Sequence, residues 1–394
     1  MKIVIAPDSF KENLTSLQVA TAIERGIKRV LPNAHCVKIP MADGGEGTVQ
    51  SLVDATGGRI IRKKVTGPMG EPVNARFGLL GDGKTAVIEM AQASGLPLVE
   101  KAKRDPSKAT TYGTGELIRY ALHRGVEAII VGIGGSATVD GGAGMAQALG
   151  VRFMDKSGGP LAEGASGGSL NQIWAIDSSG LDPRVRRSKV VIACDVNNPL
   201  CGPRGAARVF GPQKGASPAM VKLLDDNLRH FATLLQKTFE KDFAKLPGAG
   251  AAGGLGAGLV AFAGAKMKRG IELVVKITGL ERELKDADLV ITGEGRVDFQ
   301  TAFGKTPAGV AEAARRSKIP VIAIGGGLAD DARGVFEHGI DALASAAARD
   351  MDLAEAMRLS RVHLENAAER VMRLLLVGEK LGQRKQAKKK PRGK

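Results

Sequence analysis

Acidic, hydroxyl-bearing and lysine side chains recur in this 394-residue sequence, in glycine-rich stretches that directly follow short apolar runs. Such runs are typical of buried strands, and in an open parallel sheet the carboxyl ends of the strands form the edge where ligands bind. We therefore expect these polar side chains to gather at one edge of one sheet. They are Asp8, Ser9, Lys11, Asp43, Glu46, Ser136, Thr138, Asp140, Glu294, Arg296 and Lys305.

This set of side chains suits phosphoryl transfer. That chemistry requires backbone donors and cations around the phosphates, Mg²⁺, and a group that orients or deprotonates the attacking hydroxyl. Lys11, Lys214 and Lys305 are candidates for the cations, and the acids are candidates for the other roles. A Walker A loop is excluded, because Phe299 stands where that motif requires a glycine ahead of residues 304–306.

The loop in residues 131–144, VGIGGSATVDGGAG, fits a second class of enzyme. Gly132-x-Gly134-x-x-Ala137 follows a predicted strand and precedes a predicted helix, as in dinucleotide-binding proteins, and Asp155 lies near the expected acidic position. A nicotinamide-dependent oxidoreductase is therefore the alternative function.

The same loop also has the composition of a phosphate-binding loop. Gly134 and Gly135 allow backbone N–H groups to approach an anion, and Ser136, Thr138 and Asp140 add polar groups suited to phosphate or a polyhydroxy substrate. No other feature of the sequence indicates hydride transfer, so we favour the phosphate or substrate anion.

Asp195 stands at the end of the apolar run VVIACD and is followed by Asn197 and Asn198. This position suits a general base or a group that organises Mg²⁺. It equally suits an aspartate that only stabilises a turn, and the sequence leaves both interpretations open.

Strands alternating with helices over much of the chain predict a doubly wound parallel sheet. Residues 58–98 break this alternation with strands typical of antiparallel hairpins, and residues 151–284 contain scattered strands, a helix near 218–239 and a glycine-rich helix. We expect a two-domain α/β protein with the active site in the cleft between its domains. The predicted domains are a Rossmann-like one (residues 1–57, 108–150 and 286–378) and an inserted α/β (α+β) one (residues 58–107 and 151–285).

Composition sets further expectations. The net charge of +16 is concentrated at the C-terminus, where residues 379–394 predict a basic disordered tail that could bind nucleic acid only nonspecifically. Three cysteines without a C-x-x-C pair, together with an N-terminus unlike a signal peptide, predict a reduced cytoplasmic protein. Residues 246–265 lack charge but are glycine-rich, so we expect a buried helix and no membrane association.

Six motifs in order resemble the glycerate kinase family of bacterial glyoxylate and sugar-acid catabolism, over about residues 1–376. They are APDSFKENLTS, MADGGEGT, GIGGSATVDGGAGM, ACDVNNPLCGPRGAARVFGPQKGA, GAGAAGGLGAGL and ITGEGRVDFQTAFGKTP. The resemblance implies phosphorylation of D-glycerate by ATP and Mg²⁺, with 2-phosphoglycerate favoured over 3-phosphoglycerate as product. It implies two α/β domains around a cleft; we expect a monomer or a homodimer. The lysine-rich extension departs from the family pattern.

The resemblance and the residue chemistry together assign expected roles to individual residues, but they do not identify the metal ligands. We expect catalysis by Asp195, Asp8 and Lys11. We expect substrate binding by Ser9, Asp43, Glu46, Ser136 and Thr138. We expect nucleotide or phosphate binding by Gly134, Gly135, Lys214, Gly293, Glu294, Gly295, Asp298 and Lys305.

Overall fold

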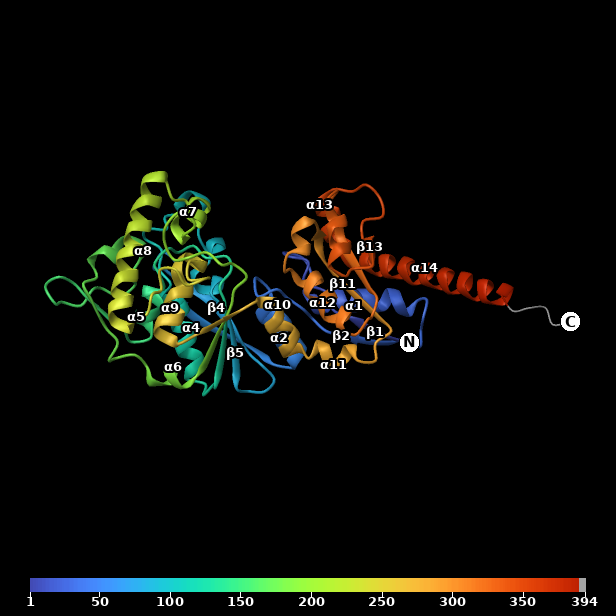
Figure 1. The fold of residues 1–394 in the computed structure, drawn as a ribbon, viewed down its shortest axis with the longest axis horizontal. Coiled ribbons are helices and arrows are strands. Elements are labelled where there is room, and N and C mark those ends of the chain that lie inside the picture. The colour runs from blue at the N-terminus through green and yellow to red at the C-terminus, as the bar shows by residue number, and fades with distance from the viewer. Residues whose placement is uncertain (390–394) are drawn as a thin grey trace. The chain divides into compact units, whose positions relative to one another are not determined.

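The structure is a computed structural model that describes residues 1–389. The chain forms two compact units. Unit 1 comprises residues 1–43 and the chain from residue 274 onward, and unit 2 comprises residues 44–273. Helix α10 (Gly270–Thr278) spans the boundary in sequence (Figure 1).

Unit 1 is built on a five-stranded sheet in the order β13-β12-β11-β1-β2, in which every neighbouring pair is parallel. The pairing of β1 with β11 joins the start of the chain to residues nearly three hundred positions later, in the register Ile3 to Leu289. The strands are β1 (Lys2–Ile5), β2 (His35–Lys38), β11 (Leu289–Val297), β12 (Val321–Leu328) and β13 (Ala342–Ser345).

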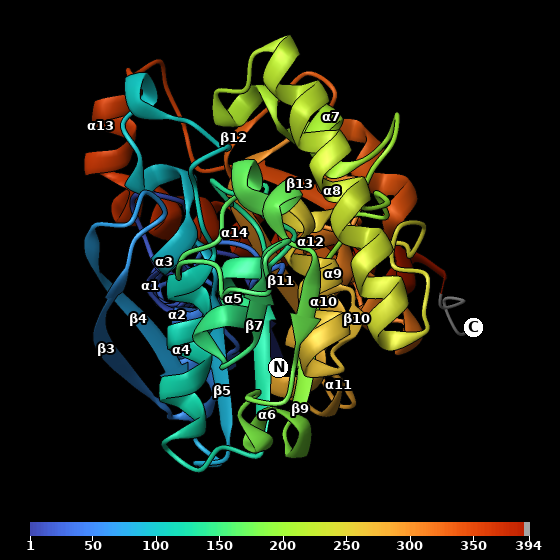
Figure 2. The same ribbon diagram turned by 90° about the vertical axis from the view of Figure 1, so that its left-hand side faces the viewer.

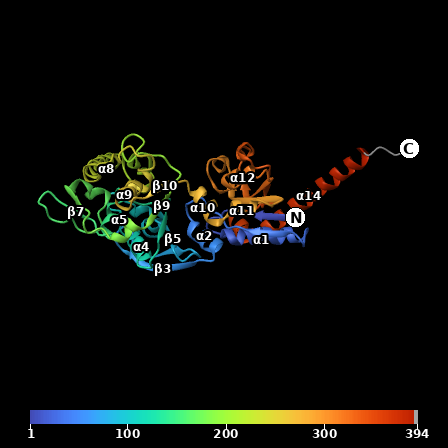
Figure 3. The same ribbon diagram turned by 60° about the horizontal axis from the view of Figure 1, so that its bottom comes forward.

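Helices α1 and α14 pack against each other and cover the unit 1 sheet. Ile23 and Ile27 of α1 form a core with Leu364, Ala368 and other apolar residues of α14. Beyond this core α14 continues as a single long helix (Figure 3). The helices are α1 (Ser16–Lys28), α11 (Leu280–Leu284), α12 (Thr306–Arg316), α13 (Leu353–Arg358) and α14 (Ser360–Lys389), with 3₁₀ turns η6 (Phe299–Ala302) and η7 (Ala332–His338).

Unit 2 contains a six-stranded mixed sheet in the order β10-β9-β6-β5-β4-β3. The strands β3, β4 and β5 are antiparallel, whereas β5, β6, β9 and β10 are parallel. The strands are β3 (Arg59–Thr66), β4 (Pro72–Leu79), β5 (Thr85–Glu89), β6 (Ala128–Gly132), β9 (Lys189–Ala193) and β10 (Lys266–Lys268), and β7 (Arg152–Met154) and β8 (Ala175–Asp177) form a separate hairpin.

The alternation of side chains along β4 gives the two faces of this sheet different neighbours. Ala75, Phe77 and Leu79 point into the main core, whereas Gly78 lies against Val49 and Val53 of α2. On the core side, α4 packs over the sheet (Figure 2).

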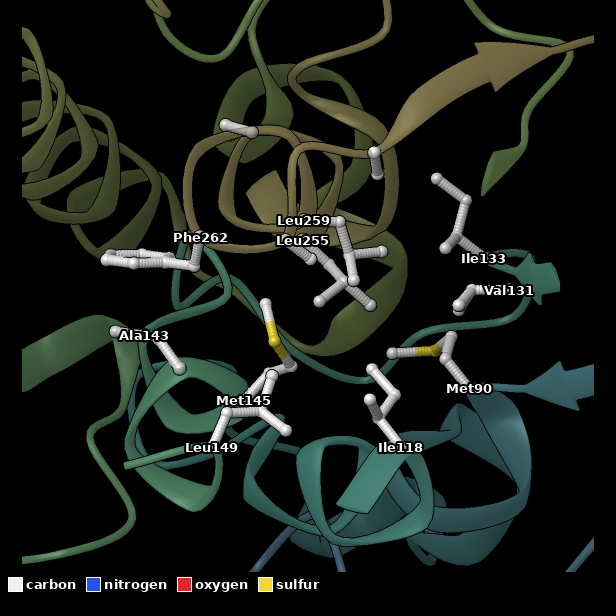
Figure 4. Packing of buried hydrophobic residues seen from close by; sticks show 14 of the residues in the cluster. Met90, Ile118, Val131, Ile133, Ala143, Met145, Leu149, Leu255, Leu259 and Phe262 are labelled. Atoms are coloured by element: carbon white, nitrogen blue, oxygen red, sulfur yellow. The ribbon is translucent and has the colours of Figure 1, made fainter. Parts of the chain in front are cut away.

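Met145 of α5 lies among Ile118 of α4 and Leu255 and Leu259 of α9 (Figure 4). The core of unit 2 is therefore made by small, closely packed helices above the sheet. The helices are α2 (Thr48–Thr56), α3 (Ala91–Ser94), α4 (Tyr112–Leu122), α5 (Ala143–Ala148), α6 (Pro183–Arg187), α7 (Ala206–Phe210), α8 (Pro218–Phe239) and α9 (Leu255–Ala263), with short 3₁₀ turns η1 (Leu96–Leu98), η2 (Lys101–Lys103), η3 (Gly167–Gln172), η4 (Pro212–Lys214) and η5 (Ala251–Gly254).

Several local sequence patterns predict what the structure contains. A threonine followed three residues later by a glutamine predicts a capping box, and Thr15 and Gln18 form it reciprocally at the start of α1. Gly57 ends α2 in the left-handed conformation, and α8 occupies residues 218–239 as expected. The hairpin strands expected over residues 58–98 are β3, β4 and β5.

The predicted domain boundaries require correction. Residues 108–150 were expected in the Rossmann-like domain, but β6 pairs with β5 and β9 inside the sheet of unit 2. Residues 44–57 also belong to unit 2, because α2 packs on β4 and β5. Each unit has its own parallel strands. The alternation of strands and helices along the sequence does not reveal which of these strands share a sheet.

The predicted tail also differs from the structure. Residues 379–389, expected to be disordered, continue α14, and residues 390–394 lie outside the described residues. No helix within residues 1–389 is long and apolar enough to span a bilayer. The glycine-rich segment 246–265 forms only the nine-residue α9 and its entry turn.

We expect truncation after Glu379 to leave the free energy of unfolding unchanged, because the described side chains of residues 380–386 are exposed. Met372→Ala should instead cost about 2–5 kcal/mol, since this side chain is fully buried. Urea denaturation measures both, and a truncation as damaging as Met372→Ala would contradict this assignment.

Candidate functional site

Asp8 stands just past the end of β1 and is almost completely buried. Its Oδ2 accepts a hydrogen bond from Thr306 Oγ1 at 2.6 Å, and its Oδ1 accepts one from the Ser9 N–H at 2.6 Å. Burial raises the pKa of Asp8 to about 7, and the negative charges of Asp43 and Glu294 add to this rise while the two hydrogen bonds oppose it. The structure thus holds a carboxyl group that can gain or lose a proton near neutral pH.

Two further acids come from the strand beside β1. Glu294 lies within β11, where its Oε1 accepts a hydrogen bond from Thr301 Oγ1 at 2.7 Å and burial raises its pKa. Asp298 follows the strand and accepts a hydrogen bond from Lys305 Nζ at 3.3 Å. Lys305 Nζ is 3.9 Å from Glu294 Oε2, so one lysine serves two carboxylates.

These groups line a cavity of about 800 Å³ formed entirely by residues of unit 1. Most of its charged side chains come from the segments that follow β1 and β2 and from β11 with the segment after it, whereas β12 contributes Gly326 and Gly327. The structure therefore brings together most of the site residues predicted in this unit. They are Asp8, Ser9, Lys11, Asp43, Glu294, Gly295, Arg296, Asp298 and Lys305.

The carboxylates of this cavity have the chemistry to bind Mg²⁺. Asp43, Glu294 and Asp298 bring carboxylate oxygens to the cavity, and proteins commonly hold Mg²⁺ through one or two carboxylates together with substrate phosphates. Within residues 1–389, no group of three or more His, Cys, Asp or Glu side chains is spaced to hold a metal ion alone.

Gly293 has a structural position within β11. A Cβ atom there would overlap the carbonyl oxygen of Ile324 in β12, and the Gly293 carbonyl accepts a hydrogen bond from the Asp8 N–H at 2.8 Å. This glycine thereby lets the strands approach and fixes the backbone of Asp8. Gly293, Glu294 and Gly295 lie inside the strand, because β11 continues to Val297.

The prediction of one common sheet edge is wrong for the loop after residue 132. This loop follows β6, which belongs to the sheet of unit 2. Ser136 Oγ and the Thr138 carbonyl each accept a hydrogen bond from the buried Lys214, at 2.6 and 2.7 Å. Burial lowers the pKa of Lys214 to about 7, although the negative charge of Asp140 opposes this shift.

Asp140 is used to hold the same loop together. Its carboxylate is fully buried and accepts hydrogen bonds from the backbone and hydroxyl of Thr111, both at 2.7 Å, and from the N–H groups of Gly142 and Gly144. Burial raises its pKa even though these donors oppose the rise. Hydrogen bonds from neighbouring residues therefore account for the buried Asp140 carboxylate without a ligand.

Gly134 and Gly135 are exposed, and their N–H groups have no hydrogen-bond partner among residues 1–389. Gly135 has a φ of 72°, which favours glycine. Helix α5 begins only at Ala143, so Ala137 is not in the helix as a dinucleotide-binding turn requires.

Glu46 and Asp195 are exposed residues of unit 2. Glu46 lies in the turn before α2, and Asp195 Oδ1 accepts a hydrogen bond from the Gly270 N–H at 3.1 Å. Neither residue lines the unit 1 cavity.

The sequence prediction missed three buried residues. Thr306 orients Asp8, and Thr301 orients Glu294. Glu89, at the end of β5, accepts a hydrogen bond from the Val49 N–H at 2.8 Å, and burial raises its pKa. Thr301 lies three residues after Asp298 and forms a capping box with it at the start of η6, and this spacing was a possible signal for Thr301. Glu89 looked like the end of an ordinary strand.

A parallel α/β unit that places acids and lysines around a cavity has the features of an enzyme acting on small anions. Comparison with known proteins specifies the class. A model of the glycerate kinase family matches residues 3–376, and the chain therefore belongs to this family of kinases.

The chain is similar to curated relatives along almost its whole length. It is 58% identical to a glycerate kinase of Halalkalibacterium halodurans, over 94% of this chain and 97% of the relative. It is 53% identical to a glycerate 2-kinase of Escherichia coli K12, over 96% of this chain and 99% of the relative.

A solved structure gives the same result for the fold. A crystal structure of a candidate glycerate kinase 2 from Salmonella typhimurium LT2 matches with a TM-score of 0.89 and 52% identity, over 96% of this chain and 99% of that one. The family resemblance is thus confirmed, and the nicotinamide-dependent alternative has no support among these relatives.

The raised pKa of Asp8 predicts a specific pH dependence of stability. The folded chain keeps a proton that an ordinary aspartate releases near pH 4, so the free energy of unfolding should fall as the pH rises from about 4 to about 7, by at most about 1.4 kcal/mol per unit. Asp8→Asn should remove this component. The difference between variant and wild type, measured by urea denaturation, should therefore grow across the range.

Asp226→Asn, on the exposed face of α8, is the matched control and should show a constant difference. A constant difference for Asp8→Asn as well would contradict the raised pKa.

Proposed function

We propose that this chain transfers the γ-phosphoryl group of ATP to the 2-hydroxyl of D-glycerate in the presence of Mg²⁺. Family membership supports the reaction, and the 53% identity to a relative named glycerate 2-kinase supports the position of transfer. The observation that carries the proposal is the buried Asp8, placed among lysines and acids in the unit 1 cavity.

In this proposal Asp8 is the general base. As the glycerate oxygen attacks the γ-phosphorus, its proton passes to Asp8 while the bond from phosphorus to the bridging oxygen breaks and ADP leaves. A base is most effective when its pKa is near the working pH, and Asp8 meets this condition. Thr306 and Ser9 are positioning residues that aim the two carboxylate oxygens.

Lys11 and Lys305 would bind phosphate oxygens, and Arg296 adds a third cation to the cavity. Lys305 is already directed by Asp298 and Glu294, so a phosphate would meet a side chain whose position is restricted. One or two of the carboxylates of Asp43, Glu294 and Asp298, together with phosphate oxygens, would hold Mg²⁺, which would neutralise charge on the phosphates when bound.

The loop of residues 134–138 is proposed as a second anion-binding element. Its exposed Gly134 and Gly135 N–H groups are available to a carboxylate or phosphate, and Lys214 keeps the loop in shape through Ser136 and Thr138. Lys214 is therefore proposed to position the loop and not to contact the phosphate, whereas Glu46 and Asp195 keep their predicted substrate and catalytic roles as proposals.

The direct test is incubation with ATP, Mg²⁺ and D-glycerate. We expect ADP release that depends on all three components, with L-glycerate as a control, and a product identified by ³¹P NMR as 2-phosphoglycerate. Formation of 3-phosphoglycerate would overturn the position of transfer, and failure to release ADP would overturn the function.

We expect Asp8→Asn to lower kcat about 10²–10⁴-fold with little change in the KM for ATP, because a general base acts on the chemical step. The same measurement on Asp195→Asn ranks the two predicted bases. If Asp8→Asn keeps more than half of the wild-type kcat, Asp8 is not the base.

Gly135→Val should abolish turnover, because the side chain strains a residue with φ of 72° and shields the loop N–H groups. Gly134→Ala is the matched control, since its Cβ would lie 3.7 Å from the nearest heavy atom and its φ is not positive. Calorimetric titration with glycerate and with an ATP analogue, on variants whose circular dichroism is unchanged, separates loss of binding from misfolding. Normal binding and turnover in Gly135→Val would exclude an anion-binding role.

A further inference from the structure

The unit 1 cavity is larger than glycerate requires, and its lining includes apolar as well as charged side chains. Its volume of about 800 Å³ is in the range of sites for molecules of drug size, about 300–1,000 Å³. Glycerate is a three-carbon acid with almost no apolar surface, so it would leave most of this space empty.

The additional space is bordered by a wall of unit 1 to which no role is assigned above. We define the α13–α14 wall as the cavity-lining residues between 346 and 363. They include Met351, Leu353, Met357, Ser360 and His363, together with charged side chains at positions 349, 350 and 352. Asn13 Nδ2 donates a hydrogen bond to the Met357 carbonyl at 3.1 Å, which ties the segment after β1 to this wall.

Two features of the wall indicate a ligand with an apolar body and a polar edge. Leu353 is 75% exposed although it lines a cavity, so an occupant could cover apolar surface that the chain leaves in water. His363 Nε2 is buried and has no hydrogen-bond partner among residues 1–389. A buried ring nitrogen without a partner is costly. His363 lines the cavity, so a ligand group there can satisfy Nε2 when the ring turns toward it.

We infer that the α13–α14 wall binds the nucleobase of the nucleoside triphosphate that donates the phosphoryl group. Leu353 and Met357 provide apolar contact for the base, and His363 Nε2 hydrogen-bonds its edge. This inference rests on the proposed function, because it assumes that the charged part of the same cavity takes the phosphates. It places the adenine of ATP at the wall and the triphosphate toward Lys305 and Asp8.

The test compares ligands with and without a base on the full chain. Isothermal titration with Mg·ADP and with Mg·pyrophosphate gives the two dissociation constants. Leu353→Ala should raise the dissociation constant of Mg·ADP about tenfold, in line with the loss of a leucine side chain that the ligand covers. It should leave Mg·pyrophosphate and the KM for D-glycerate within twofold of wild type.

The chain offers matched controls for both variants. Leu374→Ala removes a leucine that is 70% exposed on α14 and does not line the cavity, so it should leave both dissociation constants unchanged. His363→Ala should weaken Mg·ADP and reduce the preference for ATP over other nucleoside triphosphates, whereas His338→Ala, an exposed histidine outside the cavity lining, should do neither.

The outcomes distinguish this inference from the proposed function. If wild type phosphorylates D-glycerate but Leu353→Ala and His363→Ala bind Mg·ADP like their controls, the nucleobase assignment alone is overturned. If Leu353→Ala selectively loses Mg·ADP while wild type shows no activity on D-glycerate, the wall is supported and the choice of acceptor is overturned. If a wall variant binds Mg·ADP and Mg·pyrophosphate equally more weakly than wild type, the wall does not contact the base, and the assignment is also overturned.

Discussion

The parallel pairing of β1 with β11 is the constraint on which the candidate site depends. It places Asp8 beside Gly293 and Glu294, although these residues are separated by most of the chain. Gly293 permits the close approach of β11 to β12 and holds the Asp8 backbone, so the position of the proposed base is fixed by the sheet itself. A site built at strand ends in this way needs little from flexible loops.

Burial of acids next to one another gives this site its chemistry. Asp8, Asp43 and Glu294 face one cavity, and their mutual repulsion together with desolvation favours a protonated Asp8 up to about pH 7. Lys305 offsets part of this charge through Asp298 and Glu294. This clustering of acids is unfavourable for the folded chain alone, and a bound cation would relieve it, which is a common relation between a functional site and stability.

The sequence predicted local structure better than it predicted sheet membership. The capping box at Thr15, the end of α2 at Gly57 and the bounds of α8 follow from short-range patterns, and all three are present. Whether β6 joins β1 or β5 depends on pairing between distant residues, which an apolar run of five residues does not encode. For the same reason, the residues that line the unit 1 cavity were predicted as a group, but they were wrongly joined to Ser136 and Thr138.

The motif residues of the two units also differ in whether hydrogen bonds within the protein account for their burial. Asp140 is fully buried with four hydrogen-bond donors, so its place in a glycine-rich motif reflects the folding of a loop. Lys214 donates to Ser136 and to the Thr138 carbonyl, which makes it part of the same support.

Asp8 and His363 present the opposite case. Asp8 accepts hydrogen bonds from Thr306 and from the N–H and hydroxyl of Ser9, yet burial beside other acids raises its pKa. His363 Nε2 has no hydrogen-bond partner within residues 1–389. A motif alone does not separate these cases, since both kinds of residue occur near glycines and strand ends. For Asp8 the separation comes from its burial beside other acids, which a bound cation would relieve. For His363 it comes from the hydrogen-bond partner that Nε2 lacks, which a ligand at the cavity would supply.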